Sequence, residues 1–180
     1  MMYQTGELVI YGAAGVCRVD GVAYPEASGA DKGRAVLCAQ ALQQSGCIYT
    51  PVENGTTPMR PVISAREAEA LIDLIPTIRA EAVYRPTLQA LAQHYQSVLR
   101  SNDCREVLRL TMSIHCKEQA AQARKRRLGL VDERYRKQAE RLLHGELAAA
   151  LGISPEEVQP YIARRVAGAP AGTAREDLAQ

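Results

Sequence analysis

The feature that most constrains the fold is a change of sequence period near residue 64. Up to Ile63 the chain runs in short β-prone segments separated by glycines and prolines. From Ser64 onward, apolar residues recur every three or four positions, which is the spacing of one face of an α-helix. The change predicts an α+β, two-domain chain: a β domain over 1–63, a helical bundle over 64–167 and a frayed tail over 168–180.

Five segments of the first part have strand character: 8–11, 16–22, 35–38, 47–51 and 59–63. Glycines at positions 12, 15 and 46 and a loop-like stretch over 25–33 separate them. We interpret Gly12-Ala13-Ala14-Gly15 as a hairpin turn, because no helix follows it as a phosphate-binding loop would require. Short strands at this spacing predict a small barrel or a strongly bent sheet.

Helix-starting signals divide the second part. Ser64 and Glu67 have the capping-box spacing, Asp103 can cap a long helix, and Ser154-Pro155 combines a capping residue with proline at the first helical position. The chain has no Phe and no Trp, so its core must come from Leu, Ile, Val, Ala and Met. Helices are predicted over 64–75, 87–100, 103–124, 132–151 and 154–166.

The cysteines and the N-terminal residues indicate the cellular compartment of the protein. The chain has 5 cysteines, an odd number, widely spaced and without a C-x-x-C pair, and its first residues lack the pattern of a signal peptide. No stretch approaches the roughly 20 apolar residues that span a bilayer. We therefore expect a cytoplasmic protein with reduced thiols and no membrane contact.

Catalytic and metal-binding patterns are weak in this sequence. Cys104, His115 and Cys116 lack the tight ligand pairs of structural zinc sites, and no histidine falls on a turn beside a candidate nucleophile. No P-loop pattern or paired-carboxylate arrangement is present. We expect no enzyme activity, no cofactor and no metal.

Positive charge is concentrated in one stretch of the helical part. The β part carries 4 basic and 5 acidic residues, whereas residues 117–141 carry 9 basic and 4 acidic ones. A run of cations at a helix end can complement the helix dipole as a solvated face, or it can bind phosphates. The candidate phosphate-binding residues are Arg124, Lys125, Arg126, Arg127, Arg134 and Lys137.

Several motifs occur in an order that resembles the CarD family of bacterial transcription regulators. They are Gly6-Glu7-Leu8-Val9-Ile10-Tyr11, Gly15-Val16-Cys17-Arg18-Val19, Ile48-Tyr49-Thr50-Pro51-Val52-Glu53-Asn54, Met59-Arg60-Pro61-Val62-Ile63-Ser64 and Ala139-Glu140-Arg141-Leu142-Leu143 with Gly145-Glu146-Leu147-Ala148. The similarity extends over roughly residues 2–162, and the order and spacing of the motifs make it more specific than any one of them.

The resemblance implies an N-terminal Tudor-like, SH3-like barrel that binds the β subunit of RNA polymerase. It also implies a helical domain that touches promoter DNA without reading a sequence and modulates the stability of the open complex. The candidate polymerase-binding residues are Leu8, Val9, Ile10, Tyr11, Val36, Ile48 and Tyr49. An edge strand can pair with a partner's sheet, and a basic patch can hold phosphates.

This sequence departs from the family where many members place a Trp that wedges against the minor groove. Leu88 falls nearest that position, and Tyr84 lies just before it. An apolar or aromatic side chain can still insert between base steps. The wedge is therefore weaker, taken over by Tyr84, or absent. We expect a monomer, and the alternative function is a polymerase-binding adaptor that does not contact DNA.

Overall fold

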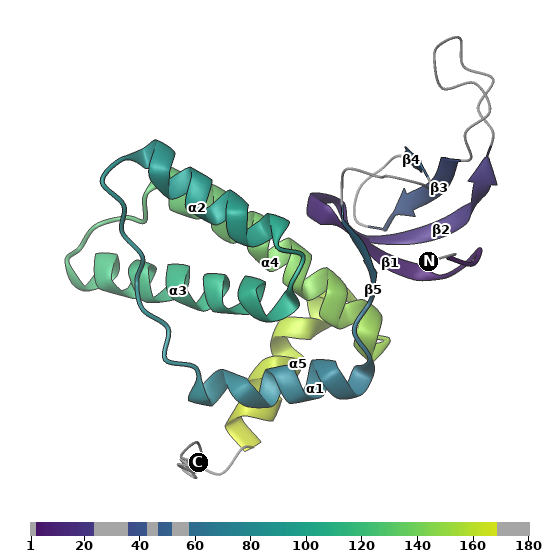
Figure 1. The fold of residues 1–180 in the computed structure, drawn as a ribbon. Coiled ribbons are helices and arrows are strands. Elements are labelled where there is room, and N and C mark those ends of the chain that lie inside the picture. Colours follow the sequence, from purple (N-terminus) through teal and green to yellow (C-terminus); the bar gives the residue numbers. More distant parts are fainter. Residues whose placement is uncertain (1–2, 24–35, 43–46, 52–57, 169–180) are drawn as a thin grey trace, which may run out of the picture.

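The computed structural model describes residues 3–23, 36–42, 47–51 and 58–168 of the 180-residue chain. Within them a small antiparallel sheet precedes five α-helices, which confirms the predicted α+β layout. Figure 1 shows the sheet on one side of the molecule and the helices on the other. The loop expected over 25–33, the turn at Gly46 and nearly all of the tail expected over 168–180 lie outside the described residues.

Five strands form the sheet in the order β4-β3-β2-β1-β5, with every neighbouring pair antiparallel. They are β1 (Leu8–Tyr11), β2 (Gly15–Ala23), β3 (Val36–Ala41), β4 (Cys47–Pro51) and β5 (Met59–Pro61), close to the five predicted segments. In the described residues β4 and β5 do not pair with each other, so the sheet is open and the expected closed barrel is not seen. A register shift between Val19 and Gly21 on β2 marks an irregularity of the kind that bends a sheet.

The glycine-rich segment between β1 and β2 is a turn, as predicted. Gly12–Ala14 form a single 3₁₀ turn, and the paired strands run antiparallel on either side of it. Gly15 adopts φ +79°, a left-handed conformation that favours glycine. A Cβ atom added to Gly15 would lie only 3.1 Å from Leu142 Cδ2 in the helical part. The absence of a side chain at Gly15 therefore also allows the turn to pack closely against Leu142.

Local capping fixes the starts of the first three helices. Before α1 (Ala65–Leu74), the Ser64 hydroxyl accepts from the Glu67 N–H at 3.2 Å and the Glu67 carboxylate accepts from the Ser64 N–H at 2.8 Å. The 3₁₀ turn η2 (Ile75–Thr77) follows α1. Thr87 caps α2 (Leu88–Arg100), and Asp103 caps α3 (Cys104–Ala123). The capping box predicted at Ser64 and the cap predicted at Asp103 are confirmed.

The last two helices differ slightly from the prediction. α4 (Leu130–Leu151) begins behind Gly129, before the expected Asp132, and has no side-chain cap at its start. It ends at Gly152, whose φ of 67° is the left-handed conformation expected of a residue that ends a helix. α5 (Pro155–Gly168) follows. In the part of the chain described, no helix is long and apolar enough to cross a membrane.

Aliphatic side chains build most of the helical core, together with two tyrosines. Tyr95 and Tyr135 are buried with ring centroids 5.4 Å apart, and they supply the aromatic packing that Phe or Trp provides in other proteins. Residues 78–87 form an extended segment between η2 and α2 that crosses α3 (Figure 1). Ser113 Oγ on α3 donates to the Glu81 carbonyl at 2.6 Å and so holds this segment in place.

An ion pair joins the sheet to the helices. Arg60 on β5 reaches the Glu146 carboxylate on α4 through both terminal nitrogens, with Nη2 to Oε2 at 2.8 Å, and its Nε donates to the Asn102 carbonyl. Glu146 is buried, and its Oε1 also accepts from the Ile63 N–H at 3.3 Å. We call Arg60, Asn102 and Glu146 the junction. A bidentate arginine–carboxylate pair of this kind fixes the relative orientation of the two side chains as well as their distance.

Candidate nucleic-acid interface

The basic run forms the turn between α3 and α4. We call residues 124–129 the tip; it lies at the end of the helical part away from the sheet (Figure 1). Lys125 N donates to the Gln122 carbonyl and Arg126 N to the Ala121 carbonyl, each at 2.8 Å, which is the pattern of a Schellman motif. Lys125 occupies the left-handed position of the motif, with φ 56°, where glycine is the usual residue.

The six predicted phosphate-binding residues fall into two groups. The side chains of Arg124, Lys125, Arg126 and Arg127 are exposed, and none makes an ion pair or hydrogen bond with the described residues. Arg134, by contrast, lies over the Tyr135 ring at 5.7 Å. Lys137 Nζ is 3.2 Å from Glu133 Oε1. Of the six residues, the four tip cations are therefore those whose side chains have neither a carboxylate nor an aromatic ring as a partner among the described residues.

Tyr84 lies beside the tip although it is distant in sequence. It lines a cavity of about 160 Å³ together with Arg124, Arg126 and Arg127, and its side chain is 61% exposed. The structure thus brings together one wedge candidate and three of the candidate phosphate ligands. Leu88, the other wedge candidate, is 70% exposed as the first residue of α2, which starts at the same end of the molecule (Figure 1).

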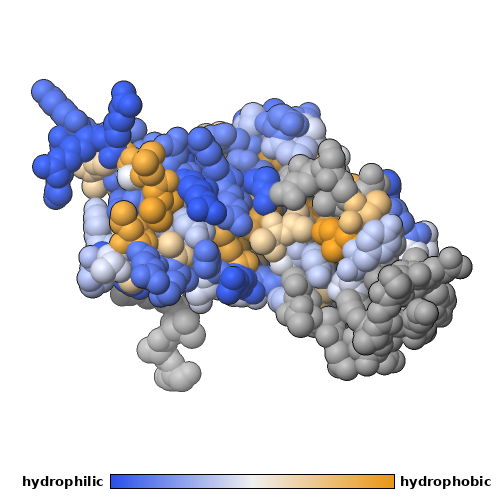
Figure 2. Space-filling view, turned by 90° about the horizontal axis from the view of Figure 1, so that it is seen from above, coloured by the Kyte–Doolittle hydropathy of each residue, from blue (hydrophilic) through white to orange (hydrophobic). Residues whose placement is uncertain are grey.

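An exposed apolar residue that the sequence analysis did not single out also lies here. Leu130, the first residue of α4, directly follows the tip and is 85% exposed. Figure 2 shows hydrophilic side chains projecting at this end of the molecule with hydrophobic ones beside them. The only signal in the sequence is a leucine next to a basic turn, and nothing in its spacing separates it from a core leucine.

A buried polar chain lies beneath Tyr84. Asp132 is 5% exposed; its Oδ1 accepts from Tyr95 Oη at 2.6 Å and from Lys117 Nζ at 2.8 Å. Lys117 Nζ in turn lies 4.8 Å from the centroid of the Tyr84 ring, within the range of a cation–π contact. Burial, together with the hydrogen bond to Asp132, raises the pKa of Tyr95 well above its usual value. Sequence reasoning missed this role of Lys117 and Asp132.

The polymerase-binding candidates occupy different positions in the sheet. β1 pairs with β2 on one side and β5 on the other, and its Val9 and Ile10 side chains are buried, whereas Leu8 and Tyr11 are half-buried. β3, which contains Val36, is also paired on both sides. β4 is an edge strand: among the described residues it pairs with β3 alone, and it carries the half-buried Ile48 and the exposed Tyr49.

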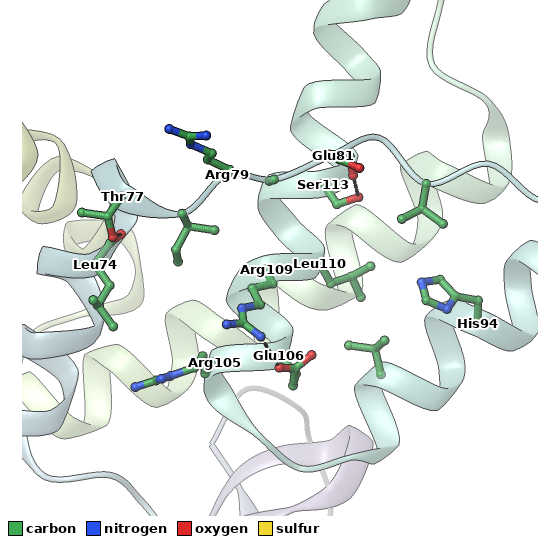
Figure 3. Close-up of a pocket in the computed structure, with 14 residues that line it drawn as sticks. Leu74, Thr77, Arg79, Glu81, His94, Arg105, Glu106, Arg109, Leu110 and Ser113 are labelled. Carbon is green, nitrogen blue, oxygen red and sulfur yellow. Dashed lines mark hydrogen bonds and ion pairs between the residues drawn. The ribbon is translucent and has the colours of Figure 1, made fainter. Parts of the chain in front are cut away.

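A separate cavity of about 610 Å³ lies between the 78–87 segment, α2 and α3 (Figure 3). Its Arg109 Nη1 is 2.9 Å from Glu106 Oε1, and Ser113 is bound to the segment as described. Burial, and secondarily the charge of Arg85, lowers the pKa of His94, which also lines it. The charged side chains drawn in Figure 3 include both arginines and glutamates. The cavity therefore has no uniform charge that would favour an anionic or a cationic ligand.

Among the described residues, the other histidines and cysteines do not form a reactive cluster. Burial raises the pKa of the Cys17 thiol to about 11 and also raises that of Cys104, which favours the unreactive protonated forms. Cys116 Sγ lies 3.4 Å from the Ala80 carbonyl. Across the described ranges, no three His, Cys, Asp or Glu side chains are grouped as metal ligands would be.

No protein-family model matches the chain, and no curated protein matches it significantly.

Proposed function

We propose that this chain is a transcription regulator of the CarD type, which binds RNA polymerase through its sheet and contacts promoter DNA through its tip. The observation that carries the proposal is the position of Tyr84 beside Arg124, Arg126 and Arg127, which have no ion-pair partner among the described residues. Cations without internal partners can neutralise phosphates, and an adjacent aromatic ring can pack on a sugar or a base step. Neither contact requires a particular sequence.

The sheet offers a polymerase contact at β4. An edge strand presents unpaired backbone N–H and C=O groups, and a partner strand can add to it by main-chain hydrogen bonds. Tyr49 is 62% exposed on this strand, so its ring can contribute contact area beside those hydrogen bonds. In this proposal β4 binds the β subunit of RNA polymerase, as the Tudor-like module does in the CarD family.

The junction supports a regulator that acts on two partners at once. Arg60 and Glu146 hold β5 against α4, and Arg141 Nη2 donates to the Ala13 carbonyl of the β1–β2 turn at 3.0 Å. These contacts keep the polymerase-binding edge and the tip at a set separation. A protein built in this way stabilises an open complex only where polymerase and DNA are presented at that same separation.

The test measures open-complex lifetime with the full chain, RNA polymerase and a promoter. We expect Tyr84→Ala and Leu88→Ala to shorten the lifetime while polymerase binding is retained, because each removes an exposed side chain at the DNA-facing end. Leu74→Ala on α1 is the matched control for removal of an exposed leucine. An unchanged lifetime in either variant would remove that residue from the mechanism.

A protein-only adaptor is the second candidate, and the edge position of β4 favours it independently of the tip. Tyr49→Arg should weaken polymerase binding under either function, because it alters the edge strand. The two functions differ in what the tip does. Polymerase binding that is equally strong with and without promoter DNA, in wild type and tip variants alike, would support the adaptor.

A further inference from the structure

Two features beneath the tip are not explained by a general basic surface: the cavity beside Tyr84 and the buried Lys117–Asp132 pair. The cavity volume of about 160 Å³ is roughly five times the 30 Å³ that a water molecule occupies in the liquid. That volume has room for a phosphate group with its five heavy atoms.

The lining of the cavity has the chemistry of an anion site. Arg124, Arg126 and Arg127 line it, and their side chains make no hydrogen bond or ion pair with the rest of the described chain. Gly129, Lys117 and Asp132 also line it, and the Asp132 carboxylate is already paired with Lys117. Guanidinium groups donate hydrogen bonds to phosphate oxygens.

Lys117 has a different role from these arginines. Its Nζ lies 2.8 Å from Asp132 Oδ1, and the two side chains are 12% and 6% exposed. Because Asp132 offsets its charge, Lys117 adds no net charge to the cavity. The same ammonium group lies 4.8 Å from the Tyr84 ring centroid and so holds the ring at the cavity wall. The hydroxyl of Tyr95 fixes Asp132 from the core side.

We propose that the cavity seats one phosphate group of a nucleic-acid strand, and that Lys117, held by Asp132, positions Tyr84 so that the attached sugar or base lies on its ring. The inference rests on the proposed function and makes it more specific. The arginines supply the charge, Tyr84 supplies the stacking surface, and Lys117 is a positioning residue. An unstacked or single-stranded nucleotide fits this arrangement best, since its ring faces are free.

The charge balance of the pair allows a sharp test. The double variant K117M/D132N removes one positive and one negative charge together, so the net charge of the site is unchanged and no buried charge is left without a partner. The amide oxygen that D132N introduces can still accept from Tyr95. A fall in affinity in this variant with an unchanged salt dependence therefore reports on positioning and not on electrostatics.

The experiment measures binding of a short fluorescent oligothymidylate to the full chain by anisotropy over a range of salt concentrations. We expect Y84A and K117M/D132N each to weaken binding by about tenfold, the scale of removing one base–aromatic stack. Adding Y84A to K117M/D132N should cause no further decrease, because both act through the same ring. K117R, which keeps the cation, should retain most of the affinity.

The same assay measures the contribution of the cavity arginines to oligonucleotide binding. R126A/R127A should reduce the slope of log affinity against log salt by about 0.7 for each phosphate of a single strand that the variant no longer neutralises. Inorganic phosphate, titrated at constant ionic strength, should compete only at far higher concentration than the oligonucleotide, since it cannot use Tyr84. Circular dichroism melting of each variant controls for folding.

Four results would overturn the inference. Additive effects of Y84A and K117M/D132N would show that Lys117 does not act through Tyr84. An unchanged salt slope in R126A/R127A would remove the phosphate site, and equal affinity for phosphate and oligonucleotide would remove the stacking surface. If oligonucleotide binding is absent but tip variants still weaken DNA-dependent binding to a polymerase–promoter complex, this inference fails and the proposed function stands.

Discussion

Arginine serves opposite purposes at the junction and at the tip. At the junction, Arg60 is one-quarter exposed, both of its terminal nitrogens reach Glu146, and its Nε donates to a backbone carbonyl. At the tip, Arg124, Arg126 and Arg127 are exposed, and their side chains make no hydrogen bond or ion pair with the described residues. Residue type alone thus says little about function; the available partners decide whether an arginine holds the fold or is free to bind another molecule.

The difference also explains how each region tolerates change. A partly buried charge depends on its partner, because removing the partner leaves it desolvated and unpaired. An exposed charge without a partner can be removed at little cost to the fold. Variants of the junction should therefore change stability most, and variants of the tip arginines should change binding.

The largest expected effect on stability is at the junction. Glu146→Ala leaves Arg60 without its carboxylate and should lower the free energy of unfolding by about 3–5 kcal/mol, as measured by urea denaturation. Glu106→Ala breaks the exposed pair with Arg109 and should cost less than about 1 kcal/mol. Similar decreases in the two variants would refute the distinction between buried and exposed pairs.

A smaller effect is expected from the buried support of the tip. Tyr95→Phe removes the hydroxyl that donates to Asp132 and should lower the free energy of unfolding by about 1–3 kcal/mol. Burial and Asp132 raise the pKa of Tyr95 in the folded state, so this contribution is present below the unfolded pKa of about 10 and is lost as pH rises above it. The gap in unfolding free energy between wild type and variant should narrow above that pH. A constant gap would contradict the raised pKa.

The smallest effect concerns the backbone of the tip. Lys125→Gly places glycine at the left-handed position of the Schellman motif and should raise the free energy of unfolding by about 0.5–1 kcal/mol, although it removes a cation. Lys125→Ala serves as the control, since it removes the same charge without relieving the backbone. If Lys125→Gly and Lys125→Ala change the free energy of unfolding by the same amount, the backbone at Lys125 is not strained.

Local signals in the sequence predicted the elements well. The strands and the capped starts at Ser64 and Asp103 depend on residues within a few positions of one another, which a pattern can detect. The start of α4 was misplaced because Asp132 has the chemistry of a cap. Its carboxylate instead binds Tyr95 and Lys117, neither of which is adjacent in sequence.

Long-range pairing limited the prediction of the sheet and of the site. The contact of Arg60 with Glu146 spans 86 positions, so no local pattern could reveal it. The basic run was visible as a cluster of charge, but which of its residues lack internal partners depends on tertiary packing. For the same reason, the position of Tyr84 at the tip and the open order of the strands emerge only from the structure.

The most direct test of DNA contact by the tip is the salt dependence of binding to a polymerase–promoter complex. The full chain is compared with a variant in which Arg124, Lys125, Arg126 and Arg127 are all replaced by alanine, and with Arg66→Ala/Arg105→Ala as a control for removal of exposed charge elsewhere. The slope of log affinity against log salt should shrink by about 0.9 for each duplex phosphate that the tip no longer neutralises, with binding to polymerase alone unchanged. Equal slopes for the wild type and the tip variant would contradict DNA contact and leave the adaptor as the function of this chain.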